Sequence, residues 1–322
     1  MPEFEQALPS VANREAARAA GFSDDQVTRR LRSGVWTSLR HGRFTATAEL
    51  ADRRRWQAEV LAHAAEHRRP LTLSHAHAAR AWGWPSPLDG WGIVTFTATS
   101  GPTRRGSVHI TVAPLDPEEQ VQSTVTITSP ARTVVDCART LPGRDGLAVA
   151  DAALRSRLVP PDQLAGALER VKGWPGAPRA RHVVALADGR RESPLESWSE
   201  WSFTALGLPA PQWQVDILDG DGLLLGRGDA WWREGVIGEA DGRAKYRTRV
   251  VERGAATLAG YEAVLHEERG RESRFRRSGA LVVRWEARDV LVTVRERELA
   301  AYVRTQLKAA ENQEFTGSVR LR

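Results

Sequence analysis

Three strand-like runs joined by tight turns, in the last third of the chain, most constrain its fold. The first two, Gln212–Leu218 and Leu223–Trp232, are joined by the acidic turn Asp219-Gly220-Asp221-Gly222. The third, Val236–Asp241, follows the tight turn Arg233-Glu234-Gly235. Turns this short place consecutive strands side by side and antiparallel, so we expect the three runs to form one sheet.

Helix-like and strand-like segments are mixed along all 322 residues, which predicts the α/β class with a mixed α+β organisation. The pattern changes near residue 190, where a helix precedes three strands, a helix near 250–268, a strand and a closing helix. The run Lys172-Gly-Trp-Pro-Gly-Ala-Pro is the best linker candidate. We therefore predict three domains, over residues 1–50, 51–172 and 190–322.

Residues 10–44 predict a compact helical unit that ends in a hairpin. A short helix from Asn13 to Ala20 is followed by Ser23, which can cap a second helix. The run VWTSLRHGRFTA then alternates apolar and polar residues around His41-Gly42, which is typical of a two-stranded wing. Helix, turn, helix and basic hairpin are the elements of a winged helix-turn-helix, so we predict this fold for the first domain.

Arginines gather on the second helix and the hairpin of this predicted domain. Such side chains can contact DNA phosphates or base edges, and the alternative is a solvated arginine face. The candidate DNA-binding residues are Arg29, Arg30, Arg32, Arg40 and Arg43. Weaker candidates are Arg53–Arg55 and the run Arg269, Arg271, Arg274, Arg276 and Arg277.

The charge balance leaves the nucleic-acid question open. Lys+Arg 46 against Asp+Glu 40 gives a net charge of +6, and arginine supplies nearly all of the positive charge. Arginine suits phosphate recognition, but a GC-rich genome also encodes arginine-rich chains. No window approaches the ~20 apolar residues that span a bilayer, and residues 1–20 contain no apolar run behind a basic start. We expect a cytoplasmic protein with no membrane partner.

Cysteine and histidine offer little for catalysis or metal binding. The only cysteine, Cys137, excludes a disulfide framework and a multi-cysteine metal site, and we expect a small buried residue within a helix. His75 and His77 lie two residues apart, but no nearby carboxylate or cysteine completes a ligand set. We expect them to have a helix-capping or surface role.

Three carboxylates converge in the predicted sheet. A turn centred on Glu234 places Asp229 directly opposite Glu239, and strand alternation puts Glu239 and Asp241 on one face. Like charges across a strand pair repel, and a divalent cation such as Mg²⁺ removes that penalty. The alternative is a strand pair with acids on its solvated face.

This set suits metal-assisted phosphodiester cleavage. The ion would bind a phosphate oxygen and lower the pKa of the attacking water. Lys245 could stabilise the charge that gathers on the phosphorus centre. Glu196, in the helix from Leu195 to Gly207, could reach the same cluster. We therefore predict Asp229, Glu239 and Asp241 as Mg²⁺ ligands, and Glu196 and Lys245 as catalytic residues.

The segments ESPLESW, GLPAPQWQVDI, RGDAWW and IGEADGRAKY resemble restriction-endonuclease-like domains near the very-short-patch-repair nucleases, in the PD-(D/E)XK superfamily. The resemblance implies a mixed sheet flanked by helices that cuts DNA with magnesium. It makes Glu196 the helix acid, Asp229 the central metal ligand and Glu239 the second ligand. Asp241 stands where the superfamily carries a lysine, and Lys245 falls where relatives carry a histidine or lysine.

The segment REAARAAGFSDDQVTRRLRSGVWTSLRHGRFT resembles the winged-helix region of AbiEi-type antitoxins, and TLSHAHAARAWGWP and TSPARTVVDCAR resemble segments that follow it. This resemblance implies an N-terminal domain that binds the promoter of its own operon. It also implies that the remainder neutralises a cognate toxin protein, a nucleotidyltransferase. The chain departs from the family in a shorter first helix and a nuclease-like tail.

Two hypotheses follow. The first is a DNA-binding protein with an endonuclease-like C-terminal domain that cleaves DNA with Mg²⁺. The second is a non-catalytic, antitoxin-like transcriptional regulator, whose nuclease-like domain serves as a DNA or protein platform.

Overall fold

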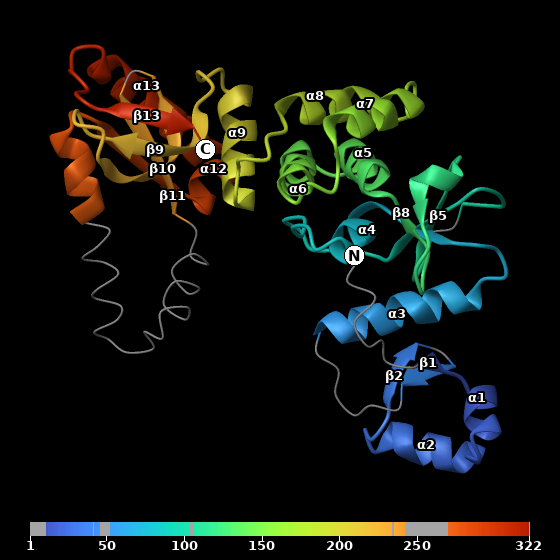
Figure 1. Cartoon of the computed structure of the whole chain (residues 1–322). Coiled ribbons are helices and arrows are strands. Elements are labelled where there is room, and N and C mark those ends of the chain that lie inside the picture. Colours follow the sequence, from blue (N-terminus) through green and yellow to red (C-terminus); the bar gives the residue numbers. More distant parts are fainter. Residues whose placement is uncertain are drawn as a thin grey trace. The chain divides into compact units, whose positions relative to one another are not determined.

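The chain has the mixed α+β organisation that its sequence predicts (Figure 1). The computed structural model describes residues 11–40, 42–45, 52–103, 106–233, 235–241 and 270–321. Two expectations, the helix near 250–268 and the position of Lys245, lie outside these ranges. Contacts divide the chain into two compact units, the first comprising Met1–Leu141 with Pro161–Ala177 and the second Pro142–Pro160 with Pro178–Arg322.

The first unit begins with the predicted pair of helices and hairpin. Asn13 accepts a hydrogen bond from the Ala16 amide at the start of α1, and Ser23 forms a capping box with Gln26 at the start of α2. Val27 of α2 packs with the stacked rings of Trp36 and Phe44. The elements are β1 (Val11–Ala12), α1 (Arg14–Ala19), α2 (Asp24–Arg32), β2 (Thr37–Arg40) and β3 (Arg43–Thr45), with sheet order β1-β3-β2.

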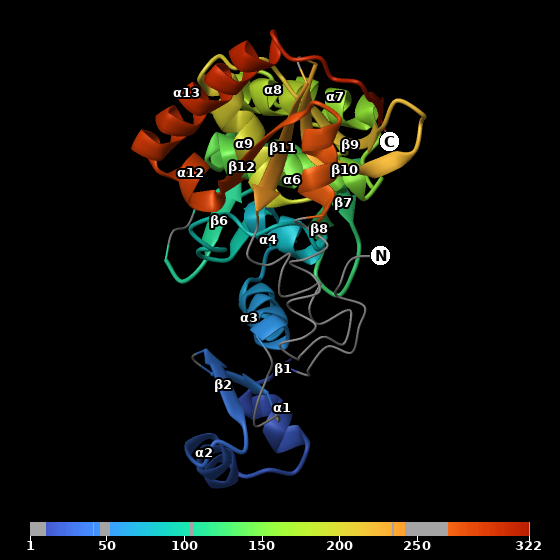
Figure 2. The ribbon, with the colours of Figure 1, turned by 90° about the vertical axis from the view of Figure 1, so that its left-hand side faces the viewer.

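A second sheet follows in the same unit, and α3 contacts both sheets (Figure 2). Trp56 and Val60 of α3 pack with Leu73 and Phe96 of the second sheet. Its strand order is β6-β5-β4-β8-β7. The elements are α3 (Asp52–Glu66), β4 (Thr72–Leu73), α4 (His75–Ala81), β5 (Thr95–Ala98), β6 (His109–Val112), β7 (Gln120–Val121), β8 (Ile127–Thr128), α5 (Pro130–Thr140) and α7 (Pro161–Arg170).

The predicted linker at 172–178 packs against α5 instead of bridging freely. Arg139 donates a hydrogen bond to the Pro175 carbonyl at 2.7 Å, and its guanidinium lies 5.0 Å from the Trp174 ring centroid. Gly176 adopts a φ of +81°, and a Cβ there would lie 2.3 Å from the Arg139 carbonyl oxygen. A side chain at this position would therefore break the contact. The division into three domains stays a prediction, while one of the three points where the chain passes between the two units falls within this run, after Ala177.

The second unit is built on a five-stranded sheet with order β12-β11-β10-β9-β13. The three predicted strands pair antiparallel in sequence order, and β12 adds to β11 in parallel. The short elements α12 and β13 had no sequence prediction. The elements are α6 (Gly143–Arg155), α8 (Ala177–Leu186), α9 (Pro194–Ala205), β9 (Gln212–Leu218), β10 (Leu224–Trp232), β11 (Val236–Asp241), β12 (Leu281–Glu286), α12 (Ala287–Leu291), α13 (Thr293–Ala310) and β13 (Ser318–Leu321).

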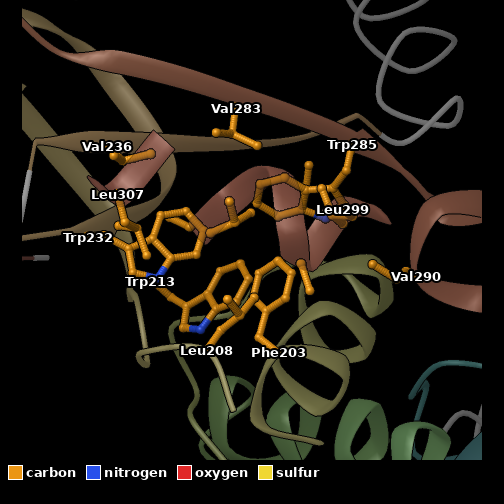
Figure 3. Packing of buried hydrophobic residues seen from close by; sticks show 14 of the residues in the cluster. Phe203, Leu208, Trp213, Trp232, Val236, Val283, Trp285, Val290, Leu299 and Leu307 are labelled. Carbon is orange, nitrogen blue, oxygen red and sulfur yellow. The ribbon is translucent and has the colours of Figure 1, made fainter. Parts of the chain in front are cut away.

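Aromatic rings fill the core on one face of this sheet (Figure 3). Phe203 of α9 meets the rings of Trp232 and Trp285 at centroid distances of 5.7 and 5.4 Å. The indole nitrogens of three fully buried tryptophans are satisfied: Trp213 donates to Glu200, Trp232 to the Pro209 carbonyl and Trp285 to Ser199. Packing therefore accounts for these rings, and α9 is fixed against the sheet.

A buried ion pair joins α6 to the segment that precedes α9. Arg191 donates to Asp151 at 2.6 Å, and both side chains are almost completely buried. The hydroxyl of Ser197, on α9, donates to the same carboxylate at 2.6 Å. These bonds hold the start of α9, where Glu196 lies. Within the described ranges, no helix has the length and apolar character needed to cross a membrane.

Candidate functional site

The hairpin of β10 and β11 has the register that the sequence predicts. Ala230 pairs with Gly238 and Trp232 pairs with Val236. Continued by one residue beyond the last recorded pair, this register would bring Asp229 opposite Glu239, and the two carboxylates interact electrostatically. The Asp229 carboxylate accepts a hydrogen bond from the Ala240 amide at 2.9 Å. Asp229 therefore reaches across to the neighbouring strand at the position that the sequence analysis singled out.

Glu239 is the most perturbed of the predicted acids. It is 4% exposed, and its pKa is raised from 4.5 to about 7, chiefly because burial disfavours the charged carboxylate. Arg271 opposes this shift, while the negative charges of Asp229 and Asp241 add to it. All three predicted ligands are thus close enough to interact electrostatically. Within the described part of the chain, the Oε1 atom of Glu239 is buried without a hydrogen-bond partner.

Two arginines neutralise these acids in the structure. Arg271 donates to Glu239 Oε2 at 2.7 Å, and it comes from the helical residues 270–277, whose Phe275 packs on the same sheet face as Ile237. Arg284 lies across from Glu239 in the parallel register of β11 and β12, and it approaches Asp241 at 3.5 Å. The negative cluster therefore already has counter-charges from the protein.

The positions of these acids fit a metal ion that is held by two carboxylates better than one that is held by three. No group of three or more His, Cys, Asp or Glu side chains among the described residues has a metal-holding arrangement. Magnesium often uses only one or two carboxylates and keeps its waters. Asp229 and Glu239, with its unpartnered Oε1, have the oxygen chemistry that this ion prefers. Their role as ligands stays a prediction.

Glu196 performs a local structural task at the start of α9. It is fully buried, its Oε1 accepts from the Ser193 hydroxyl at 2.8 Å, and its Oε2 accepts from the Glu192 amide at 2.9 Å. The Gln214 side chain donates to the same Oε2 at 2.7 Å, which ties α9 to β9. Gln214 has a φ of +57°, so this strand is irregular at the contact. The catalytic role of Glu196 stays a prediction.

The predicted DNA-binding arginines differ in their availability. Arg29 and Arg32 are exposed on α2, and both line a shallow hollow of about 480 Å³. Arg30 is half-buried instead, with its guanidinium 4.9 Å from the Phe22 ring centroid. Arg43 donates to the Ala65 carbonyl at the end of α3. The side chain of Arg40 lies outside the described residues.

The histidine pair is buried, so the surface alternative of the predicted helix-capping or surface role is wrong. His75 is 8% exposed and His77 is 2% exposed, and burial lowers the pKa of His77 to about 4. The periodicity of a short Ala-rich helix gave no sign that α4 is covered on nearly every side. Cys137 is buried in α5 as predicted, and burial raises the pKa of its thiol.

Comparisons with known proteins place the chain beside two uncharacterised relatives. No family model matches it. It is 38% identical over 105 residues to "Uncharacterized protein MT2308" of Mycobacterium tuberculosis strain CDC 1551 / Oshkosh, and equally to "Uncharacterized protein Rv2248" of strain ATCC 25618 / H37Rv. The match covers 33% of this chain and 38% of each relative, so the chain spans well under half the length of the curated proteins it matches.

The raised pKa of Glu239 predicts a specific pH dependence of stability. An acid whose pKa is higher in the folded state stabilises the fold below its unfolded value near 4.5, and this contribution is lost as pH rises through about 7. The wild type should therefore lose stability between about pH 4 and about pH 8, whereas Glu239→Gln has no carboxyl to titrate at this position. In buffer with EDTA, the free energy of unfolding of Glu239→Gln relative to that of the wild type should rise by about 3 kcal/mol between these two pH values. Urea unfolding at both pH values measures this difference.

Glu311→Gln, at an exposed position after α13, is the control and should follow the wild-type profile. A difference between Glu239→Gln and the wild type that stays constant with pH would contradict the burial of a perturbed carboxyl.

Proposed function

We propose that this chain is a cytoplasmic DNA-binding protein whose second unit carries an endonuclease-like site for Mg²⁺-dependent cleavage of DNA phosphodiester bonds. The observation that supports the cleavage most strongly is the electrostatic interaction of Asp229 with Glu239, together with a buried Glu239 oxygen that has no partner among the described residues. The mixed sheet flanked by helices is the architecture that the restriction-endonuclease-like resemblance implies. DNA is the proposed substrate.

In this proposal Asp229 and Glu239 hold the ion, and Asp241 assists. The bound ion would act as a Lewis acid on a phosphate oxygen and lower the pKa of a water. Arg271 contacts Glu239 at 2.7 Å, so its guanidinium must share that carboxylate with the ion or move to the DNA phosphate. Either way it adds positive charge where charge gathers during cleavage. Lys245 is proposed for the same task, and Glu196 keeps α9 attached to β9 beside the site.

Cleavage should depend on the acid pair and on magnesium. Asp229→Asn keeps the side-chain shape but removes the charge that a cation needs, so nicking of supercoiled plasmid should fall at least about 100-fold. Asp221→Asn, in the exposed turn before β10, should cut like the wild type. Agarose gels with Mg²⁺ and with EDTA measure both. Equal cleavage by wild type and Asp229→Asn, or none by wild type, would sink the enzymatic half of the proposal.

DNA binding is assigned to the exposed arginines of α2. Arg29 and Arg32 lie one turn apart on the helix, and neither forms an ion pair with another described residue. Val27 of the same helix is buried against Trp36, so the arginines project from a firmly packed element. Arginine binds phosphate with a planar pair of donors, which makes duplex DNA the partner that this surface suits.

Replacing both arginines should weaken DNA binding and reduce its salt dependence. Each lost phosphate contact removes about 0.9 from the slope of log affinity against log salt, so Arg29→Ala with Arg32→Ala should lower the slope by about 2. Mobility shifts on the DNA upstream of the gene measure this at several salt concentrations. The control is Arg68→Ala with Lys172→Ala, two exposed cations of the same unit. Equal slopes for the α2 variant and this control would contradict the assignment.

The second candidate is a non-catalytic, antitoxin-like regulator that binds its own promoter and a cognate toxin protein. The ion pairs of Glu239 with Arg271 and of Asp241 with Arg284 favour it, because they neutralise the acids without a metal. It predicts sequence-specific DNA binding that Asp229→Asn leaves intact, and no plasmid nicking by the wild type. The nicking assay and the mobility shift together separate the two functions.

A further inference from the structure

The first unit contains a cavity of about 890 Å³ that neither proposed activity uses. Its walls come from β5 and β6, the ends of α4 and α5, and the turn around Trp174. This volume is typical of sites that hold a small organic molecule. All of its lining residues belong to the first unit, so the cavity is independent of the carboxylate site on β10 and β11.

One wall is the polar face of a sheet edge. Phe96 and Ile110 point into the apolar core beside α3, so strand alternation turns Thr95, His109 and Thr111 to the opposite face. Thr95 pairs with His109 in the parallel register of β5 and β6, and all three polar residues line the cavity. A row of hydroxyls and an imidazole therefore faces the hollow.

The facing wall is a rigid aromatic and cationic layer. Arg139 holds the carboxylate of Asp136 at 2.9 Å and the Pro175 carbonyl at 2.7 Å, and its guanidinium lies beside Trp174. Asp136 is fully buried and is bonded by Arg132 as well. Because these bonds fix the guanidinium, Arg139 and Trp174 form a preorganised surface.

His75 adds a donor whose backbone geometry is unusual. Its φ is +55°, a left-handed conformation that a side-chain-bearing residue rarely adopts, and it persists here at the start of α4. Thr97 donates to the Ser74 hydroxyl, which lies 2.8 Å from His75 Nδ1. When Ser74 donates onward to Nδ1, the proton of the neutral ring is on Nε2. His75 then offers an N–H donor within the lining.

The lining has a clear charge preference. Among the described lining residues, Arg139 carries the only formally charged side chain, and none of them is a carboxylate. The acids of the neighbouring network, Asp136 and Glu119, are buried and turned to Arg132 and Arg139. Two tryptophans, Trp91 and Trp174, supply flat apolar area. A cation has no counter-charge among the described lining residues, whereas an anion meets a guanidinium and neutral donors.

We propose that this cavity binds a small planar aromatic molecule that carries one anionic group, a carboxylate or a phosphate. The anion contacts Arg139 together with the histidines and Thr111, and the aromatic part packs on the tryptophans. The proposal does not depend on DNA cleavage or on DNA binding.

Calorimetric titration of the full chain with two matched pairs of probes tests the proposal. The carboxylate pair is indole-3-acetate and its neutral isostere indole-3-acetamide, and the phosphate pair is adenosine 5′-monophosphate and adenosine. We expect the anionic member of one pair to bind at least about tenfold tighter than its neutral partner. The pair in which the anionic member binds more tightly shows whether the cavity prefers a carboxylate or a phosphate. Binding of neither anion at about 1 mM, or equal binding within both pairs, overturns the proposal.

Two variants locate the binding. Thr111→Trp, on the edge strand β6, fills the cavity and should weaken the anionic probe at least about tenfold while the protein stays folded by circular dichroism. Thr305→Trp, exposed on α13, should bind like the wild type. Arg139→Lys keeps the positive charge in the lining, so it should keep the preference for the anionic probe over its neutral partner. Equal affinity in Thr111→Trp and Thr305→Trp overturns the assignment of the site.

Discussion

Burial of the Glu239 carboxylate between two other acids is the constraint on which the second unit depends. Desolvation and the charges of Asp229 and Asp241 raise the pKa of Glu239 to about 7. Such a cluster persists only with positive charge close by. In this structure Arg271 and Arg284 supply it, and under the proposed function a magnesium ion shares or replaces that role. The same electrostatic need therefore explains the arginines and makes the site suitable for a cation.

Much of this arrangement followed from local sequence rules. Short turns at Asp219–Gly222 and Arg233–Gly235 set the order of β9, β10 and β11, and with it the pairing of Asp229 and Glu239. The capping residue Ser23 marked a helix start that the structure has. These features are predictable because each depends on residues that are close together in the chain.

The features that the sequence did not reveal depend on distant contacts. Arg284 meets Asp241 only because β12 pairs in parallel with β11, and Arg271 meets Glu239 only because residues 270–277 cover that face. Burial of His75 requires β5, β8 and α5 around α4. No local pattern encodes those pairings, so sequence rules alone assigned the histidines a helix-capping or surface role and left the acids without protein counter-charges.

The central claim is that Asp229 and Glu239 can hold one divalent cation between neighbouring strands. A crystal soaked in manganese, which shares magnesium's preference for oxygen ligands and scatters anomalously, tests it most directly. The account predicts an anomalous peak at about 2.1 Å from a carboxylate oxygen of each residue, with the Arg271 guanidinium shifted from Glu239. An unchanged contact of Arg271 with Glu239 and no peak between the two acids would contradict it.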